Sequence, residues 1–343
     1  MKKIDFLAIG DIVIDAFIKL EDAHVSCNVD KKNCELCMRF GDKIPYESVT
    51  VLNAVGNSPN ASVSASRLGL SSSLMTNLGD DSYGKDCLAV LEKEKIDTTF
   101  VKINEGKLTN YHYVLWYDID RTILVKHQSY ERRLPEIETL PSWIYLSSMG
   151  EDSLSFHSEI INYLKTYPEI KLAFQPGTYQ IKFGVEKLKE IYERTEIFFC
   201  NFDEASRILE TPARNTSHGD AGGESKDVLE LSKKIHALGP KIVSISDGIN
   251  GAYLYLNNEL WYIKAYPNII PSVESTGAGD AFSSTITCAL ALGKTPLEAF
   301  SWGPINSMSV VSKIGAQKGL LSREKIEEYL KNAPTDYKLT KMN

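Results

Sequence analysis

A glycine-rich turn followed by an aspartate, at residues 275–282, carries the clearest chemical signal in the sequence. The stretch reads Ser-Thr-Gly-Ala-Gly-Asp-Ala-Phe and leads into an apolar pattern of helical period that runs to about Leu292. Small residues let the backbone approach a ligand, and a helix that begins there directs its first N–H groups and the positive end of its dipole at one point. We therefore expect an anion hole formed by Gly277, Ala278 and Gly279.

Asp280 lies in the first turn of the same expected helix. A carboxylate beside an anion hole disfavours simple anion binding. It suits a general base that takes a proton from a substrate hydroxyl while the hole stabilises a phosphoryl group. The structural alternative is a glycine-rich turn that caps a helix with an aspartate near its N-terminus. The pattern predicts phosphoryl transfer with Asp280 as the base.

Two further aspartates follow the first apolar run of the chain. Residues Ile4 to Gly10 are typical of a buried strand in a parallel sheet, and Asp11 and Asp15 come just after it. Ligands of open α/β sheets bind at the carboxyl ends of the strands. Both carboxylates could accept hydrogen bonds from sugar hydroxyls, or could instead cap a turn.

A histidine and three cysteines lie in a polar segment near the N-terminus that lacks helical period. His24, Cys27, Cys34 and Cys37 have the spacing H-x2-C-x6-C-x2-C. An imidazole and three thiolates can fill a tetrahedral Zn²⁺ site, and C-x2-C is a common knuckle spacing. The cluster therefore predicts a structural zinc site in an insertion at 21–45, with free thiols or a redox pair as the alternatives.

The remaining chain alternates between strand and helix patterns, which is typical of a doubly wound α/β sheet. Parallel strands are expected at about 74–78, 143–146, 171–174, 196–200 and 241–246. Helices are expected at about 61–68 (started by residues 57–60), 85–95, 154–165, 185–193, 202–210, 226–237, 281–292, 297–313 and 323–330. A hairpin should join 251–256 to 259–264, residues 214–225 should form a surface loop, and 336–343 a polar tail.

A second hairpin, with strands at 110–117 and 122–127, is antiparallel and so lies outside the main sheet. With the N-terminal segment it should form a small β lid, from about 17–55 and 108–128, on a single domain at 1–335. Its alternating aromatic residues could line a nucleoside pocket or form the seam of a dimer. We expect a homodimer through the lid.

Composition limits the classes of function. The chain has 343 residues, 43% hydrophobic and 24% charged, with a formal net charge of -7, as in ordinary globular proteins. No long basic run is present, which disfavours nucleic acid as a partner. No uncharged apolar stretch approaches ~18 residues and no signal peptide is evident, so we expect no membrane span. The six cysteines do not resemble a secreted disulfide framework, and we expect a cytoplasmic location.

In their order along the chain, these motifs resemble the signatures of the ribokinase (PfkB) family of carbohydrate and nucleoside kinases. The matching segments are 57–69, the G-D-D turn at 79–84, the N-x-x-E motif at 201–204, the glycine loop at 247–251, 275–282 and 315–317. The resemblance spans nearly the whole chain. It implies a ribokinase-like α/β fold, a doubly wound, mostly parallel sheet with helices on both faces and a β-sheet lid. The implied activity is ATP-dependent phosphorylation of a hydroxymethyl group of a sugar.

The resemblance also implies site residues. Asp280 would be the general base, and the 277–279 turn would hold the γ-phosphate. Asn201 and Glu204 would organise Mg²⁺ and the phosphates through water, unless they form only a helix cap. Substrate would be bound by Asp15, Gly56, Asn57 and Asn60, with Asp11 joining them or serving as a cap. The nucleotide pocket would be lined by Ser246, Asp247, Gly248 and Gly251.

The sequence departs from the family pattern in several places. Val55-Gly56-Asn57 stands where a Gly-Gly pair and a lysine are frequent, which removes a cation from the sugar pocket. Pro304 replaces a polar residue near adenine, and Asn306 is expected to substitute for it. The monovalent-cation loop maps weakly onto Glu274, Gly315 and Gly319.

Three alternative functions stay open on the same fold. A nucleoside kinase would need aromatic and apolar walls. A phosphosugar kinase would need a basic clamp, for which the candidates are Lys43, Lys126, His127, Arg132 and Arg133. A non-catalytic sugar- or nucleotide-binding regulator is disfavoured because the expected catalytic motif is intact.

Overall fold

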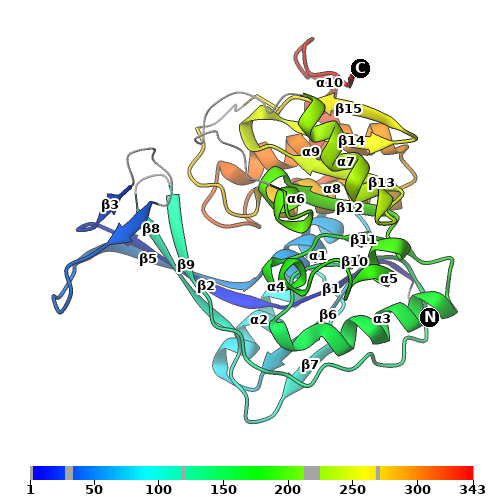
Figure 1. Ribbon diagram of the computed structural model, residues 1–343. Coiled ribbons are helices and arrows are strands. Elements are labelled where there is room, and N and C mark those ends of the chain that lie inside the picture. Colours follow the sequence, from blue (N-terminus) through cyan, green and yellow to red (C-terminus); the bar gives the residue numbers. More distant parts are fainter. Residues whose placement is uncertain (1–2, 28–33, 118–119, 212–224, 268–270, 343) are drawn as a thin grey trace.

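The computed structural model describes residues 3–27, 34–117, 120–211, 225–267 and 271–342, and shows a large sheet flanked by helices with a smaller sheet projecting from it (Figure 1). The large sheet comprises, in spatial order, β16 (Thr340–Met342), β15 (Glu259–Ile263), β14 (Ala252–Leu256), β13 (Ile242–Ser246), β12 (Ile197–Asn201), β11 (Lys171–Phe174), β10 (Pro141–Leu146), β1 (Ile4–Ile9), β6 (Ser72–Gly79) and β7 (Val101–Asn104). The strands from β13 to β7 pair in parallel, which confirms the expected fold class.

The sheet is doubly wound around β1. This strand pairs with β10 on one side and with β6 on the other, so the chain builds outward in both directions from it. At such a switch point the connections leave room for ligands at the carboxyl ends of the strands. The expected polar tail at 336–343 contributes a strand to the sheet, because Thr340–Met342 pairs with β15.

Helices cover both faces of the sheet (Figure 1). They are α1 (Asn57–Arg67), α2 (Ser82–Lys93), α3 (Leu154–Thr166), α4 (Thr178–Phe183), α5 (Lys189–Arg194), α6 (Phe202–Ile208), α7 (Ser225–Ala237), α8 (Ala278–Ala291), α9 (Pro296–Val311) and α10 (Arg323–Lys331). Short 3-10 turns occupy Glu151–Ser153 and Gly248–Asn250. The loop expected at 214–225 lies outside the described residues, except for Ser225, where α7 begins.

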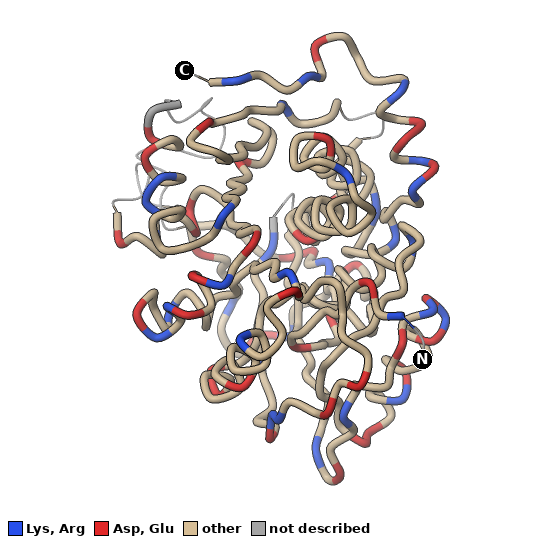
Figure 2. Tube along the Cα trace, turned by 90° about the vertical axis from the view of Figure 1, so that its right-hand side faces the viewer, with Lys and Arg blue, Asp and Glu red and all other residues tan. Residues whose placement is uncertain are grey.

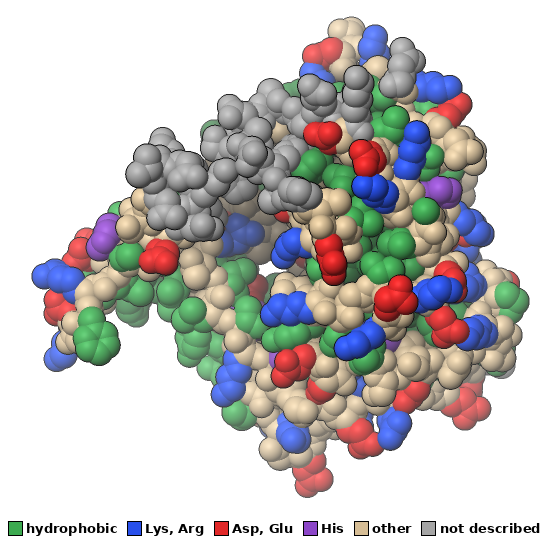
Figure 3. Space-filling view, in the orientation of Figure 1, with side chains coloured by type: hydrophobic (Ala, Val, Ile, Leu, Met, Phe, Trp, Pro, Cys, Tyr) green, Lys and Arg blue, Asp and Glu red, His purple; other side chains and the backbone are tan. Residues whose placement is uncertain are grey.

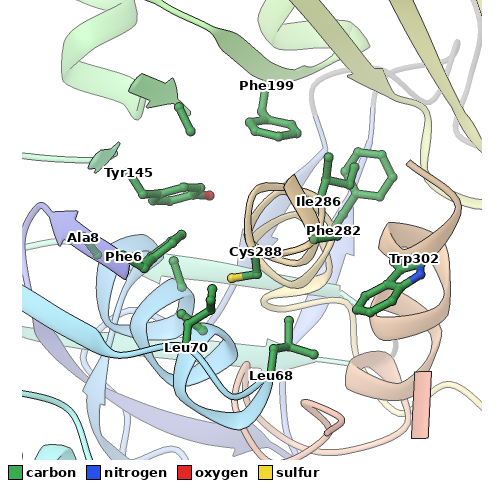
Figure 4. Packing of buried hydrophobic residues seen from close by; sticks show 14 of the residues in the cluster. Phe6, Ala8, Leu68, Leu70, Tyr145, Phe199, Phe282, Ile286, Cys288 and Trp302 are labelled. Carbon is green, nitrogen blue, oxygen red and sulfur yellow. The ribbon is translucent and has the colours of Figure 1, made fainter. Parts of the chain in front are cut away.

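Alternate residues of β1 enter different cores, because consecutive strand side chains point to opposite faces. Phe6 and Ala8 pack with residues of α1, α8 and α9, and Figure 4 shows Ile286 of α8 and Trp302 of α9 in this cluster. Leu7 and Ile9 pack with residues of α3, α5, α6 and α7. Helix α8 is therefore buried against the sheet over most of its length, which fixes the position of its N-terminus.

The smaller sheet, here called the lid, contains β5 (Tyr46–Val55), β2 (Val13–Leu20), β8 (Tyr111–Tyr117) and β9 (Asp120–Leu124), in that spatial order. Strand register assigns its two faces, since directly paired residues point the same way. The inner face includes Asp15 opposite His112, and Trp116 opposite both Lys19 and Arg121.

The outer face of the lid includes a row in which Ala16 pairs with Val51 and Tyr113. Val49, Val51, Tyr113 and Leu124 on this face are all at least 44% exposed. Figure 3 shows hydrophobic side chains gathered on the projecting sheet.

The predicted zinc site is wrong. Strands β3 (His24–Ser26) and β4 (Glu35–Cys37) form a separate hairpin, in which His24 pairs with Cys37. Cys27 and Cys34 form a disulfide bond, so two of the four expected ligands are oxidised. Across the described residues, no group of three or more His, Cys, Asp or Glu side chains could hold a metal ion. Cys27 and Cys34 are therefore paired with each other, and Cys37 is a free thiol. Residues 28–33 of the expected insertion lie outside the described part.

Charged residues of both signs are interspersed along the chain trace (Figure 2). Among the described helices, none combines the length and the apolar character that a membrane crossing requires.

Candidate active site

A cavity of about 210 Å³ lies at the carboxyl ends of β11, β12 and β13. Gln175, Asn201 and Ser246 reach it from those strand ends, and Asp280 and Glu204 contribute its two carboxylates. The remaining lining residues are Asn57, Arg121, Phe199, Cys200, Ser275, Gly277, Gly279, Phe282 and Ser283. Segments that are far apart in the chain thus meet where open α/β sheets bind ligands.

The glycine-rich turn has the backbone geometry of the expected anion hole. Gly277 has a left-handed φ of 79°, and a Cβ atom on it would lie 2.2 Å from the Cβ of Ala316. Only glycine fits both conditions. Helix α8 begins at Ala278, and Gly277 and Gly279 at its start line the cavity. The Ala278 N–H donates to the Ser275 carbonyl at 3.4 Å and the Ala281 N–H to the Gly277 carbonyl at 2.8 Å, so the N–H groups between them are the ones that an anion could bind.

Asp280 is held in the cavity by three side-chain amides. Asn57 Nδ2 donates to its Oδ1 at 2.8 Å, Asn60 Nδ2 to its Oδ2 at 2.8 Å, and Gln175 Nε2 to its Oδ1 at 3.2 Å. Burial raises the pKa of Asp280, the three amide hydrogen bonds oppose that rise, and the charge of Asp15 adds to it. The net effect is a pKa above the ordinary value, so the carboxylate is a stronger base than an exposed aspartate.

Asn201 and Glu204 form a capping box at the start of α6 and also line the cavity. Asn201 Oδ1 accepts from the Glu204 N–H at 2.8 Å, and Glu204 Oε2 accepts from the Asn201 N–H at 2.8 Å. The structural alternative for this pair is therefore present, and it does not remove the Glu204 carboxylate from the cavity. Burial raises the pKa of Glu204, against the hydrogen bond from Asn201.

A second cavity, of about 480 Å³, adjoins the first and shares Ser246, Ser275, Gly279 and Phe282 with it. Its walls are mainly apolar, as a flat base would require, and include Ile249, Ala252, Tyr266, Val273, Pro304 and Val311. The volume and lining are suited to the base and ribose of a nucleotide whose phosphates reach the anion hole.

Three of the expected nucleotide residues, Ser246, Gly248 and Gly251, line this second cavity. Asp247 instead holds the turn between them, since its N–H donates to the Gly251 carbonyl at 2.8 Å. The expectation for Asn306 is corrected. Asn306 is fully buried, donates to Thr285 Oγ1 at 2.7 Å and accepts from the Leu321 N–H at 2.9 Å, so its amide is used within the protein.

The expected substrate residues fall into two groups. Asp15 lies on the inner face of the lid, 3.5 Å from His112 Nδ1, and acts electrostatically on Asp280. Gly56 lies between β5 and α1, with a φ of 117°, directly before Asn57. Asp11 belongs elsewhere: it is buried and accepts from Arg132 Nη2 at 2.9 Å and from the Gly150 N–H at 2.8 Å. Its carboxylate is therefore already bonded, which favours a positioning role.

Glu274, expected in a monovalent-cation loop, ties two loops together. Its carboxylate accepts from the Thr276 N–H at 2.7 Å and from the Gly315 N–H at 2.8 Å. Gly319 packs against Ser309 and Val310, where a Cβ atom would lie 2.4 Å from the Ser309 carbonyl oxygen. Glu274 thereby fixes the segment just before Gly277 to the loop at Gly315.

Sequence reasoning missed Gln175, His112 and Arg121. Gln175 directly follows a buried strand and could have been found by the rule that singled out Asp11 and Asp15. His112 lies in a mainly aromatic strand, and Arg121 lies between Asp120 and Thr122 beside a turn; no local pattern marks either as a site residue.

Comparison with known proteins gives consistent matches. The family model described as pfkB family carbohydrate kinase matches residues 22–323. A ribokinase of Haemophilus influenzae is 22% identical over 284 residues, covering 81% of this chain and 87% of the relative. The structure of Arabidopsis thaliana ribokinase complexed with ribose and ATP has a TM-score of 0.76 at 18% identity, covering 96% of this chain and 99% of that one. A Methanocaldococcus jannaschii nucleoside kinase has a TM-score of 0.74 at 18% identity, covering 97% and 100%. At these identities the structural likeness shows the fold.

Proposed function

This chain belongs to the pfkB family of carbohydrate kinases, and from that membership we propose that it transfers the γ-phosphoryl group of ATP to a hydroxymethyl group of a sugar. The observation that carries the proposal is the position of Asp280. It lines one cavity with the 277–279 turn, three amides orient its carboxylate, and a nucleotide-sized cavity adjoins it.

In the proposed reaction, the substrate hydroxyl lies between Asp280 and the γ-phosphorus. Its proton passes to the Asp280 carboxylate, and its oxygen forms a bond to the γ-phosphorus. The bond from that phosphorus to the β–γ bridging oxygen breaks, and ADP leaves with the electron pair. N–H groups of the 277–279 turn stabilise the charge on the transferred group.

Glu204 would hold Mg²⁺ through water, with Asn201 fixing the start of α6 beside it. Two carboxylates face the cavity, and Mg²⁺ bound to phosphates needs only one or two because it keeps several waters. When bound, the ion would neutralise charge on the phosphates. The monovalent cation near Glu274 remains a prediction.

The substrate we favour is a neutral sugar. A phosphosugar would need uncompensated positive charge, but Arg132 pairs with Asp11 and Asp152, and Arg133 pairs with Glu159 at 3.0 Å. Asp15 and His112 on the inner face offer hydrogen-bonding groups for hydroxyls.

A nucleoside is the second candidate. The rings of His112 and His127 meet edge to face at 5.3 Å, and His127 meets Tyr179 at 5.7 Å, which forms an aromatic group beside Asp15. A structural neighbour is named a nucleoside kinase. A non-catalytic regulator is disfavoured because Asp280, the turn and Glu204 occupy one cavity.

A panel of pentoses, hexoses, their phosphates and nucleosides, assayed for ADP formation with ATP and Mg²⁺, tests the proposal. We expect turnover with one or more neutral sugars above the rate with water alone. Preference for a nucleoside would establish the second candidate, and absence of turnover with the whole panel would contradict the assignment.

We also propose that two copies associate through the outer face of the lid. Val51 and Tyr113 on this face are exposed and lie on either side of Ala16, so they form a row of apolar residues. Single exposed apolar residues are common on protein surfaces, whereas a row of them indicates an interaction surface. Partners other than small molecules and a second copy are not expected. A cytoplasmic location remains a prediction, although a reducing compartment would disfavour the Cys27–Cys34 disulfide.

A further inference from the structure

The charge of the first cavity is poorly matched to ATP. Asp280 and Glu204 contribute two carboxylates, and the phosphates of a nucleotide would add more negative charge. Among the described residues that line this cavity, Arg121 is the only one with a positive side chain. Phosphoryl transfer depends on neutralising charge at the transferred group, so this guanidinium is the protein's own counter-charge there.

Arg121 comes from the lid rather than from the main sheet. It lies on β9, directly opposite Trp116 of β8, and so on the inner face that also carries Asp15. Its Nη1 donates to Ser275 Oγ at 2.6 Å, across 154 residues of chain. Ser275 is two residues before Gly277, so the guanidinium rests at the rim of the anion hole.

We infer that Arg121, from strand β9 of the lid, is a further catalytic residue, which binds the oxygens of the transferring γ-phosphoryl group. The inference rests on the proposed function and extends it to a residue outside the main sheet. A guanidinium presents its N–H groups in a planar fork that fits two phosphate oxygens, whereas Lys offers only a point charge.

In the proposed phosphoryl transfer, Arg121 makes one contribution. As the substrate oxygen bonds to the γ-phosphorus and ADP departs with the bridging electron pair, Arg121 donates hydrogen bonds to non-bridging oxygens and exchanges no proton. The hydroxyl proton still goes to Asp280. One donor of Arg121 is bonded to the hydroxyl of Ser275, and a phosphate oxygen at the same place would accept from that donor.

Two variants and a matched control test the inference. We expect Arg121→Ala to lower kcat about 100- to 1,000-fold, the loss typical of one transition-state donor, with little change in the KM for the sugar. Arg121→Lys should recover part of the activity because it keeps the charge without the fork. Lys19→Ala is the control: Lys19 lies in the same row of the inner face but pairs with Glu47 at 2.7 Å. It should keep kcat within about 3-fold, since the charge it removes is an exposed one.

Calorimetric titration with ATP and with ADP gives a second readout that needs no sugar. Arg121→Ala should weaken ATP binding relative to ADP binding, because only ATP carries the γ-phosphate. Equal loss for both nucleotides, or retention of kcat in Arg121→Ala, overturns the inference while leaving the proposed kinase activity intact. If the unaltered protein binds no nucleotide and phosphorylates no member of the panel, the proposed function fails first and the inference fails with it. A thermal unfolding scan of each variant shows whether a loss of activity is caused by misfolding. If Arg121→Ala is misfolded, the activity and nucleotide affinities of Arg121→Lys decide the inference.

Discussion

Asn57 donates a hydrogen bond of 2.8 Å from its side-chain amide to Oδ1 of Asp280, although 223 residues separate the two in the chain. Asn60, one turn further along α1, binds the other oxygen at 2.8 Å. Residues three apart on a helix lie on one face, so the first turn of α1 holds both carboxylate oxygens from one side. The helix that begins after Gly56 thus orients the proposed base at the start of α8.

Replacing that base should separate chemistry from binding. We expect Asp280→Asn to lower kcat by at least about 100-fold, as for loss of a general base, while nucleotide affinity stays within a few-fold. Steady-state assays of ADP formation and calorimetric titration with ADP measure the two effects. Substantial turnover by this variant would show that another group removes the proton.

The hydrogen bonds to Asp280 predict a change in pH dependence. The base works only when ionised, so kcat should fall as pH drops through its raised pKa. A hydrogen bond to a carboxylate favours its ionised form, so Asn57→Ala should raise the pKa of Asp280 further and move the acid limb of the pH–rate profile to higher pH. Asn104→Ala removes an amide that bonds Asn77 instead and should leave the profile unchanged. An unmoved limb in Asn57→Ala would argue against Asp280 as the titrating group.

The buried Asp11–Arg132 pair predicts a stability effect with a defined pH range. The Arg132 side chain is 3% exposed, and Arg132→Met would leave Asp11 buried without its counter-charge, at a cost of about 3–5 kcal/mol. Burial acts to raise the pKa of Asp11, but His127 and Arg132 outweigh it and hold that pKa below 3.8. The carboxylate therefore stabilises the fold above pH 3.8 and loses that contribution as pH falls through its lower folded-state value.

Urea unfolding of the Arg132→Met variant at several pH values checks this effect. The deficit relative to the unaltered protein should be largest near neutral pH and shrink below pH 3.8. Arg133→Met, which alters an exposed arginine, should change stability by less than about 0.5 kcal/mol. Equal deficits in the two variants would contradict the buried-pair account.

The disulfide bond between Cys27 and Cys34 can be tested directly. The intact mass under non-reducing conditions should be lower by two hydrogens than after reduction, and metal analysis should find no bound zinc. The double variant Cys27→Ser with Cys34→Ser should keep kcat, because neither cysteine lines a cavity of the site. One equivalent of zinc in the unaltered protein, lost in the double variant, would instead support a zinc site that includes Cys27 and Cys34.

The proposed dimer depends on the outer face of the lid. Val51→Lys places a charge in the middle of its apolar row and should convert dimer to monomer in sedimentation velocity experiments. Val25→Lys is the matched control, since Val25 is 51% exposed but lies on the separate β3–β4 hairpin. A monomeric unaltered protein, or a Val51→Lys variant that remains dimeric, would exclude this interface.

Much of the fold follows from local patterns. Alternating strand and helix periods predict the parallel sheet, and Asn257 and Asn258, both with φ values above 50°, form the tight turn between β14 and β15. Such features depend on residues close in the chain, where backbone sterics and side-chain periodicity decide the structure. The strand β16 could not be predicted in this way, because its partner β15 lies about eighty residues away and its own pattern is polar.

The sequence by itself determined the chemistry on offer at residues 277–280: a turn that requires glycine, a helix start and a carboxylate in the first turn. Only the tertiary structure decided what surrounds that carboxylate. Gln175 reaches it from β11 and Asn57 from α1, while Asn306, close by in sequence, is used up inside the core. Arg121 likewise meets Ser275 because strand β9 of the lid reaches the segment that precedes α8. Contacts between distant segments depend on how whole elements pack, and no local sequence pattern encodes that packing.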